Sequence, residues 1–154
     1  MLQIKCSAKI NLALSIVGKR PDGYHELDML MQSVSLYDYV MLQPSSQISI
    51  SCNFKYIPTD ERNIAYRAAQ VFFKALGSKD GVDIVLKKRI PSQAGLGGGS
   101  SDCAGVLLGL NHLYENPFSM AQLKELGLTL GADVPFFFDG GCQRAQGVGE
   151  ILSP

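Results

Sequence analysis

The chain has 154 residues, of which 46% are hydrophobic and 18% are charged. That length is enough for one domain with its own core, and that composition excludes a disordered chain. Lys plus Arg and Asp plus Glu each number 14, so the formal net charge is zero. A zero balance argues against a general nucleic-acid binder, because contacts with phosphates require a basic excess.

The sequence gives little support for a membrane protein, a secreted protein or a metal-binding protein. No apolar run reaches the 18 residues that a transmembrane helix needs, and residues 1–5 lack the features of a secretory signal. Cys6, Cys52, Cys103 and Cys142 are widely spaced and form no C-x-x-C pair, which excludes zinc and thioredoxin-type motifs. We therefore expect a cytoplasmic protein with reduced thiols.

The first predicted element is a half-buried strand over residues 9–16, where apolar and polar or small side chains alternate. The expected apolar face carries Ile10, Leu12, Leu14 and Ile16. On the other face, Lys9 and Asn11 lie two residues apart. Residues 18–23 are predicted to form a turn, and the apolar stretch 29–36 is expected to return as a second strand.

The next elements are a strand over 48–54, a helix that opens at Asn63, and a strand over 82–86. The helix is predicted from apolar residues at helical spacing, which are Ala65, Ala68, Ala69, Phe72 and Leu76. Gly77 supplies its stop signal. A Gly-rich loop over 91–101 then leads into a second helix that is expected to begin near Ser101.

Two shorter elements complete the prediction. Ser119 and Gln122 match a capping box and predict a short helix, and 134–138 is expected to be a short apolar strand. No closing element is evident after Gly140. Because strands and helices are mixed without a steady βαβ rhythm, the α+β class is favoured over a doubly wound sheet.

The segment 91–105, PSQAGLGGGSSDCAG, carries the strongest functional signal. Its glycines have no side chains to block an anion, so their backbone N–H groups can turn toward phosphate oxygens. Ser100 and Ser101 add hydroxyl donors, or a ligand for a phosphate-bound Mg²⁺, and the following helix adds its positive N-terminal dipole. The spacing fits neither a Walker A loop nor a Rossmann motif. The alternatives to a phosphate cradle are a flexible connector and a tight entry into the helix.

Lys9 and Asp133 are the candidate charged partners of this loop. Lys9 interrupts an apolar or small stretch, and Asp133 lies between a glycine turn and the apolar residues 134–138. Taken singly, Lys9 could be an exposed strand lysine and Asp133 a turn-capping residue. Taken together, a cradle, a lysine and a carboxylate predict a phosphoryl-transfer site.

Three motifs together resemble those of the GHMP small-molecule kinases. Segment 91–101 is similar to the P-x-x-x-G-L-G-G-G-S-S motif of that superfamily. Segments 7–12 (SAKINL) and 22–26 (DGYHE), with 131–135 (GADVP), resemble the branch that acts in non-mevalonate isoprenoid precursor biosynthesis. Its acceptor is a small molecule, cytidine diphosphate-linked methylerythritol.

The resemblance implies an α+β two-layer fold with a left-handed βαβ crossover. It implies that residues 1–154 form the ATP-binding and catalytic N-terminal domain, and that the C-terminal domain of family members is absent from this chain. The implied reaction moves the γ-phosphoryl of ATP, with Mg²⁺, to the 2-hydroxyl of the acceptor. Two positions depart from the pattern: Ser7 stands where Pro is usual, and Asp102 where this branch often carries Asn.

The resemblance also implies roles for particular residues. Asp133 and Lys9 would be catalytic, and Asn11, Tyr24 and His25 would bind the acceptor, the last two at its cytosine. The ATP-binding residues would be Pro91, Ala94, Gly95, Leu96, Gly97, Gly98, Gly99, Ser100, Ser101, Asn63 and Lys88. Without the resemblance, His25 reads as a loop histidine, Lys88 as a solvated strand end and Asn63 as an N-cap. The sequence assigns no metal ligands.

Two other functions stay open at this point. One is a GHMP kinase for homoserine, mevalonate or a sugar, and the other is a non-catalytic nucleotide-binding fragment. A cytosine-binding pair at Tyr24 and His25 would distinguish the first of these from the branch named above. No nucleic-acid or membrane partner is expected.

Overall fold

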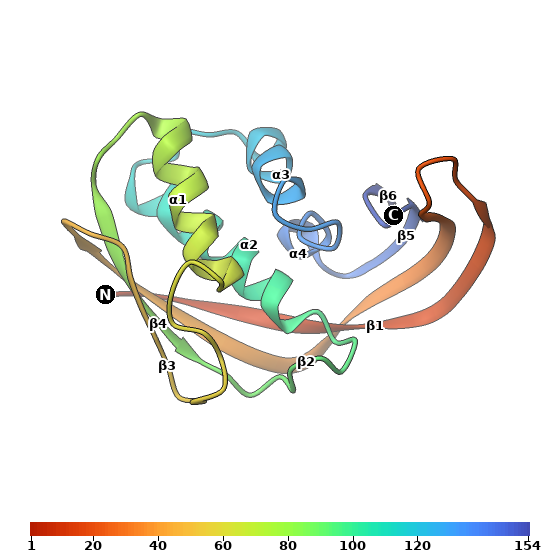
Figure 1. The fold of residues 1–154 in the computed structure, drawn as a ribbon, viewed down its shortest axis with the longest axis horizontal. Coiled ribbons are helices and arrows are strands. Elements are labelled where there is room, and N and C mark those ends of the chain that lie inside the picture. Colours follow the sequence, from red (N-terminus) through yellow and green to blue (C-terminus); the bar gives the residue numbers. More distant parts are fainter.

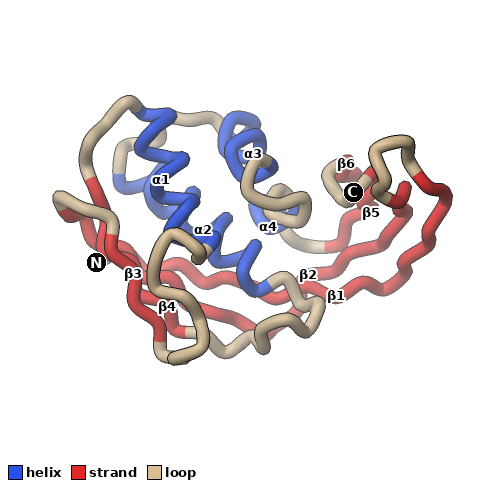
Figure 2. Tube along the Cα trace, viewed as in Figure 1, coloured by secondary structure: helices blue, strands red, loops and turns tan.

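The computed structural model describes residues 1–154 as one mixed sheet with helices packed on one of its faces (Figures 1 and 2). The strands are β1 (Leu2–Lys19), β2 (His25–Ser45), β3 (Ser49–Cys52), β4 (Gly81–Lys87), β5 (Cys142–Gly147) and β6 (Ile151–Ser153). The helices are α1 (Ile64–Leu76), α2 (Gly98–Leu113), α3 (Met120–Leu128) and α4 (Phe136–Asp139). This arrangement confirms the predicted α+β class.

The long strand β2 organises the sheet, whose order is β3-β4-β2-β5-β6 with β1 paired along the other edge of β2. Residues 39–45 of β2 pair with β4, and residues 27–32 pair with β5. The first half of β2 and the second half of β1 therefore extend past the helices as a curved arm (Figure 1). The strand predicted over 29–36 is part of β2, and the alternation at 9–16 is part of β1.

The side chains of β1 do not keep the two faces that the alternation predicts. The cross-strand partners of Lys9, Asn11, Leu14 and Ile16 are Ser33, Met31, Met29 and Leu27. Cross-strand partners share a face, and alternate residues of β2 share a face. Lys9, Asn11, Leu14 and Ile16 therefore lie on one side of the sheet. The prediction of a uniform apolar face was wrong because a register shift between Asn11 and Ala13 reverses the alternation.

Helix α1 forms where its signals predict. The Asn63 side chain accepts a hydrogen bond from the backbone N–H of Ala65, and Gly77 ends the helix in the left-handed conformation at φ 71°. The helix connects β3 to β4, which pair in parallel, so β3–α1–β4 is the crossover unit of the fold. Buried residues of α1, among them Phe72 and Phe73, pack in the main core.

Helix α2 lies close to the sheet because glycines face it. A Cβ at Gly105 would lie 2.4 Å from the Cys6 Sγ, and one at Gly109 would lie 2.5 Å from a Leu42 methyl carbon. Side chains at these two positions would push the helix outward. The absence of side chains at these positions lets the middle of α2 pack closely on β1 and β2.

Three other expectations are corrected. Residues 134–138 were expected to be a strand, but the chain turns there and forms α4, whose Phe136 fills a second small core. The end of the chain was expected to lack a closing element, but β5 and β6 add two strands to the sheet. Helix α2 begins at Gly98, three residues before Ser101, so the last glycines of the loop form its first turn.

No helix of the molecule combines the length and the apolar character needed to cross a bilayer. All four cysteines are free thiols, as predicted for a chain with a core of this size. Burial is the main cause that raises the pKa of the Cys103 thiol to about 12, and it also raises the pKa of Cys6. Both buried thiols are therefore neutral at physiological pH.

Candidate active site

The Gly-rich segment encloses a cavity of about 340 Å³. Its lining is almost entirely the loop itself: Pro91, Ser92, Gln93, Ala94, Gly95, Leu96, Gly97, Gly98, Gly99 and Ser100, with Ile64 and Lys88. Eight of the predicted ATP-binding residues between Pro91 and Ser100 thus come together at one concave surface. Ser101 does not: it is buried and does not line the cavity.

The N-terminus of α2 opens onto this cavity without a side-chain cap. The N-termini of α1 and α3 are capped by the side chains of Asn63 and Ser119. At α2 the N-cap residue is Gly97, at φ 70°, and no side chain bonds the first turn. The first N–H groups of an α-helix have no partner within the helix, so those of α2 are available to an anion.

Lys9 lies directly beneath the end of the loop. Its backbone N–H donates to the Leu96 carbonyl at 2.9 Å. A Cβ at Gly97 would lie 3.1 Å from the Lys9 Cγ and 2.6 Å from the Phe137 ring. Glycine at position 97 therefore lets the loop backbone pack on the stem of the lysine.

The Lys9 ammonium and the Asp133 carboxylate form an ion pair, with 3.5 Å between Nζ and Oδ2. The lysine also donates to the Asn11 Oδ1 at 3.1 Å. The Lys9 side chain is 6% exposed and that of Asp133 is 34% exposed, so the pair consists of a buried cation and an accessible carboxylate. Lys9 is thus not an exposed strand lysine.

A tight turn between α3 and α4 holds Asp133 in place. The Val134 N–H donates to the Gly131 carbonyl at 3.1 Å, and the Val134 side chain is fully buried. On the other side, a Cβ at Gly149 would lie 3.4 Å from the Asp133 Oδ1. Because Gly149 has no side chain, the β5–β6 connection approaches the Asp133 carboxylate with backbone atoms only. The carboxylate therefore stays accessible to solvent, with 34% of the side chain exposed.

Asn63 lies beside the cavity and Lys88 lines it, and the polar groups of both side chains are engaged. The Asn63 amide bonds the N–H of Ala65 and the carbonyl of Pro58. Lys88 is 5% exposed, and its ammonium pairs with Asp38 and Asp102, so it is not a solvated strand end. Both residues line a neighbouring cavity of about 230 Å³.

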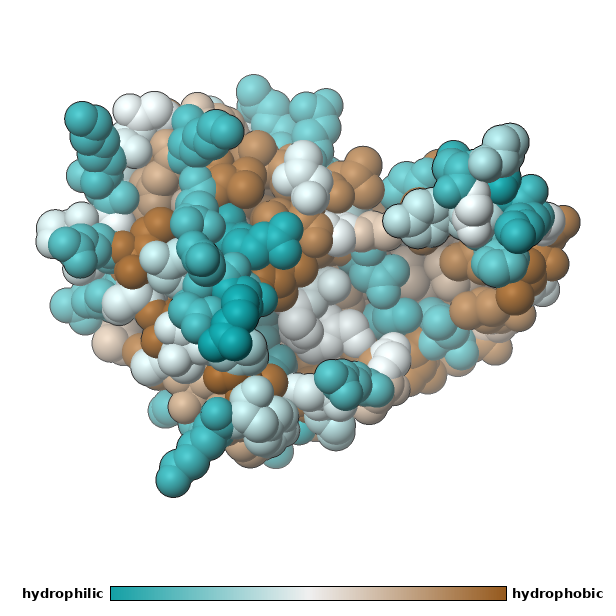
Figure 3. Space-filling model, in the orientation of Figure 1, coloured by the Kyte–Doolittle hydropathy of each residue, from teal (hydrophilic) through white to brown (hydrophobic).

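Tyr24 and His25 lie at the far end of the arm, where β1 turns into β2. The Tyr24 ring is 65% exposed, and the turn is held by the Tyr24 N–H, which donates to Asp22, and by the Arg20 N–H, which donates to the Tyr24 carbonyl. The space-filling view shows a hollow between this arm and the helical part (Figure 3). The side of the arm that carries Lys9 and Asn11 continues outward through the exposed Leu14 and Ile16.

Sequence reasoning assigned no role to Asp38 or Asn53, and treated Asp102 only as a departure from the pattern. The side chains of Asp38 and Asn53 form hydrogen bonds with the backbone of the segment that leads into the loop. The Asp102 carboxylate accepts a hydrogen bond from the Lys88 ammonium. The available signal was an acidic residue inside the apolar strand 36–42, since carboxylates are rarely buried without a partner.

Comparison with known proteins places these features in context. The sequence model described as the GHMP kinases N terminal domain matches residues 63–141. The chain is 50% identical over 155 residues to a 4-diphosphocytidyl-2-C-methyl-D-erythritol kinase of Clostridium perfringens, covering 99% of this chain and 54% of that relative. It is 51% identical over 155 residues to the enzyme of that name from Alkaliphilus metalliredigens, covering 99% of this chain and 53% of the relative.

Two solved structures are similar to the chain in fold. A crystal structure of 4-(cytidine 5'-diphospho)-2C-methyl-D-erythritol kinase superposes with a TM-score of 0.85 at 46% identity, over 99% of this chain and 55% of that one. A mevalonate kinase structure superposes with a TM-score of 0.74 at 13% identity, over 99% and 55%, which shows a shared fold alone. The chain spans about half the length of the curated relatives it matches.

Proposed function

Because the chain belongs to the GHMP kinase family, we propose that it carries the ATP-binding and catalytic half of a kinase that phosphorylates 4-diphosphocytidyl-2-C-methyl-D-erythritol in isoprenoid precursor biosynthesis. The observation that carries the proposal is the Lys9–Asp133 pair beside an uncapped, glycine-rich helix N-terminus. Phosphoryl transfer needs positioned groups of these kinds more than it needs covalent chemistry.

In the proposed reaction, Asp133 accepts the proton of the acceptor 2-hydroxyl while the oxygen of that hydroxyl bonds to the γ-phosphorus of ATP. The bond from that phosphorus to the bridging oxygen breaks, and ADP leaves. Lys9, whose ammonium lies 3.5 Å from that carboxylate, offsets negative charge on the transferring group. The N–H groups of the loop and of the first turn of α2 hold the phosphates.

The acceptor is proposed to lie along the arm. Its hydroxyl would reach Asp133 with Asn11 beside it, and its cytosine would meet Tyr24 and His25 at the tip. A tyrosine ring can stack on a pyrimidine and an imidazole can hydrogen-bond its edge. Leu14 and Ile16, on the Lys9 side of β1, give the acceptor an apolar floor.

No three His, Cys, Asp or Glu residues lie close enough together to hold a metal ion. Because Mg²⁺ at phosphate sites is held by one or two protein groups together with substrate phosphates, the Ser100 hydroxyl in the cavity lining would be a ligand for a Mg²⁺ ion bound to the ATP phosphates.

The test is turnover with a panel of acceptors. The proteins are the 154-residue chain and a chimera in which it replaces the matching half of the Clostridium perfringens relative. We expect the chimera to convert ATP and 4-diphosphocytidyl-2-C-methyl-D-erythritol to ADP and the phosphorylated acceptor, and to leave homoserine, mevalonate and galactose unchanged.

The outcomes separate the three functions. Phosphorylation of one of the other acceptors in preference to the cytidylyl compound would assign a different GHMP kinase. A chimera that binds an ATP analogue but transfers no phosphoryl group to any acceptor would leave a non-catalytic nucleotide-binding fragment. In either case the proposed function would be wrong.

A further inference from the structure

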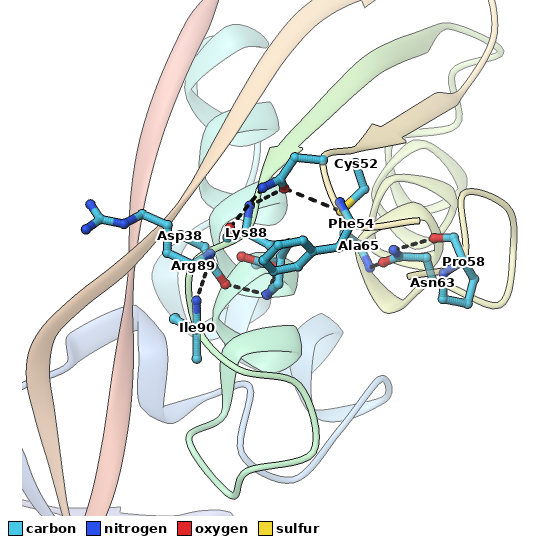
Figure 4. A network of polar contacts seen from close by, with 11 residues as sticks. Asp38, Cys52, Phe54, Pro58, Asn63, Ala65, Lys88, Arg89 and Ile90 are labelled. Atoms are coloured by element: carbon cyan, nitrogen blue, oxygen red, sulfur yellow. Dashed lines mark hydrogen bonds and ion pairs between the residues drawn. The ribbon is translucent and has the colours of Figure 1, made fainter. Parts of the chain in front are cut away.

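Behind the Gly-rich loop lies a buried cluster of three charged residues, Asp38, Lys88 and Asp102. Figure 4 shows two of them, Asp38 and Lys88, close together. The Lys88 ammonium contacts the Asp38 Oδ2, and it lies 2.6 Å from the Asp102 Oδ2. The other oxygen of Asp38 accepts hydrogen bonds from the backbone N–H groups of Arg89 at 2.5 Å and Ile90 at 2.8 Å. All three side chains are at least nine-tenths buried.

The cluster joins the two ends of the loop. Arg89 and Ile90 are the residues that lead into the loop at Pro91, and Asp102 lies in α2 just after its first turn. Asn53 adds a second hold on the entry, because its side chain bonds both the N–H and the carbonyl of Lys88. Between the two ends, residues 91–95 are exposed. The separation of the loop ends is thus set by buried side chains, of which Lys88 also lines the cavity.

The charge of the cluster is not balanced. Two carboxylates face one ammonium, and the Asp102 Oδ1 is buried with no hydrogen-bond partner. Burial raises the pKa of the Asp102 carboxyl to about 7, with Lys88 opposing and the Asp38 charge adding to that rise. Asp102 also faces Cys6 on β1 and adjoins Cys103 on its own helix, and both of these thiols are neutral. Near neutral pH, the cluster therefore exchanges one proton.

We propose that Asp38, Lys88 and Asp102 are positioning residues for the nucleotide, and that phosphates bound at the loop favour the protonated, uncharged state of the cluster. The inference rests on the proposed function, since it takes the loop as the phosphate site. A cluster that served stability alone would not need the second carboxylate, because a buried charge without a full set of partners is costly. Asp102 instead links the binding of phosphates at the loop to the uptake of a proton by the cluster.

The experiment measures the affinity for a non-hydrolysable ATP analogue, AMPPNP with Mg²⁺, by calorimetry at pH 5.5, 7 and 8.5. The proteins are the 154-residue chain, Asp102→Asn, Asp38→Asn and the control Asp83→Asn, which removes an exposed carboxylate from β4. Each titration is repeated in two buffers of different ionisation enthalpy, which reports the protons taken up on binding. Proton exchange by the nucleotide itself is common to all four proteins and cancels in their comparison.

We expect the wild-type chain to take up more protons than Asp102→Asn at pH 7, and to bind at least about five-fold more weakly than that variant at pH 8.5 but equally at pH 5.5. Asp83→Asn should match the wild type throughout. Asp38→Asn should bind more weakly at every pH, because it loses the charge that holds Lys88. If Asp38→Asn fails to fold, the comparison of the wild type with Asp102→Asn decides alone. That substitution preserves the shape of the side chain and removes only its charge.

Two results would overturn the inference. Wild type and Asp102→Asn that bind with the same affinity and the same proton uptake at all three pH values would show that the cluster does not sense the nucleotide, while the proposed function would stand. A wild-type chain that binds no AMPPNP at any pH would remove the phosphate site itself, and with it both the proposed function and this inference.

Discussion

Gly97→Ala tests the close packing of the loop on the stem of Lys9. Gly97 has φ 70°, where an L-residue is strained by about 1–2 kcal/mol. Its new Cβ would also lie 2.6 Å from the Phe137 ring and 3.1 Å from the Lys9 Cγ. Overpacking of this kind costs about 1–3 kcal/mol. The two effects together should lower the free energy of unfolding by about 2–5 kcal/mol.

The matched control is Gly95→Ala. Gly95 has nearly the same backbone, at φ 73°, but its Cβ would meet nothing within 4 Å. Only the backbone strain of about 1–2 kcal/mol applies there. Urea unfolding without nucleotide should therefore place Gly97→Ala about 1–3 kcal/mol below Gly95→Ala. Equal losses in the two variants would refute the close approach of the loop to Lys9.

Three further predictions concern other parts of the molecule. Between about pH 4 and 7 the folded chain keeps a proton on Asp102 that the unfolded chain has released, so the free energy of unfolding should fall with rising pH by at most about 1.4 kcal/mol per unit; Asp102→Asn should lose this slope in urea unfolding at pH 5 and 7.5, and an unchanged slope would contradict it. Tyr24→Ala, at an exposed position, should raise the KM for the cytidylyl acceptor in the chimera far more than the KM for ATP, whereas equal rises would count against a cytosine contact. Gly105→Ala should lower the free energy of unfolding by about 1–3 kcal/mol, and adding Cys6→Ala should recover part of the loss, because the new Cβ would lie 2.4 Å from the Cys6 Sγ; simple additivity would contradict that contact.

Local signals predicted the elements whose ends depend on neighbouring residues. Asn63 and Gly77 bound α1 as the sequence predicts, and the capping box at Ser119 is present with both of its hydrogen bonds. The juxtaposition of Lys9 with Asp133 also follows the prediction, although it came from combining motifs and not from any one pattern. Capping and turn chemistry act over three or four residues, so a single sequence contains them.

Features set by distant contacts were not predictable in this way. Which side chains of β1 share a face depends on a register shift against β2. The alternation of Leu12 and Leu14 in the sequence gives no sign of that shift. The apolar run 134–138 could form a strand or a helix, and packing of Phe136 against the strands decided for a helix. The burial of Lys88 depends on Asp38, 50 positions away in the sequence.

The most direct test of the phosphoryl-transfer site is Asp133→Asn in the chimera, with turnover and AMPPNP affinity measured on the same preparation. If Asp133 accepts the hydroxyl proton, kcat should fall by about 10²–10⁴-fold, while the nucleotide affinity stays within about three-fold because the loop proposed to bind the phosphates is untouched. A variant that keeps its turnover would show that the carboxylate beside Lys9 is not the base.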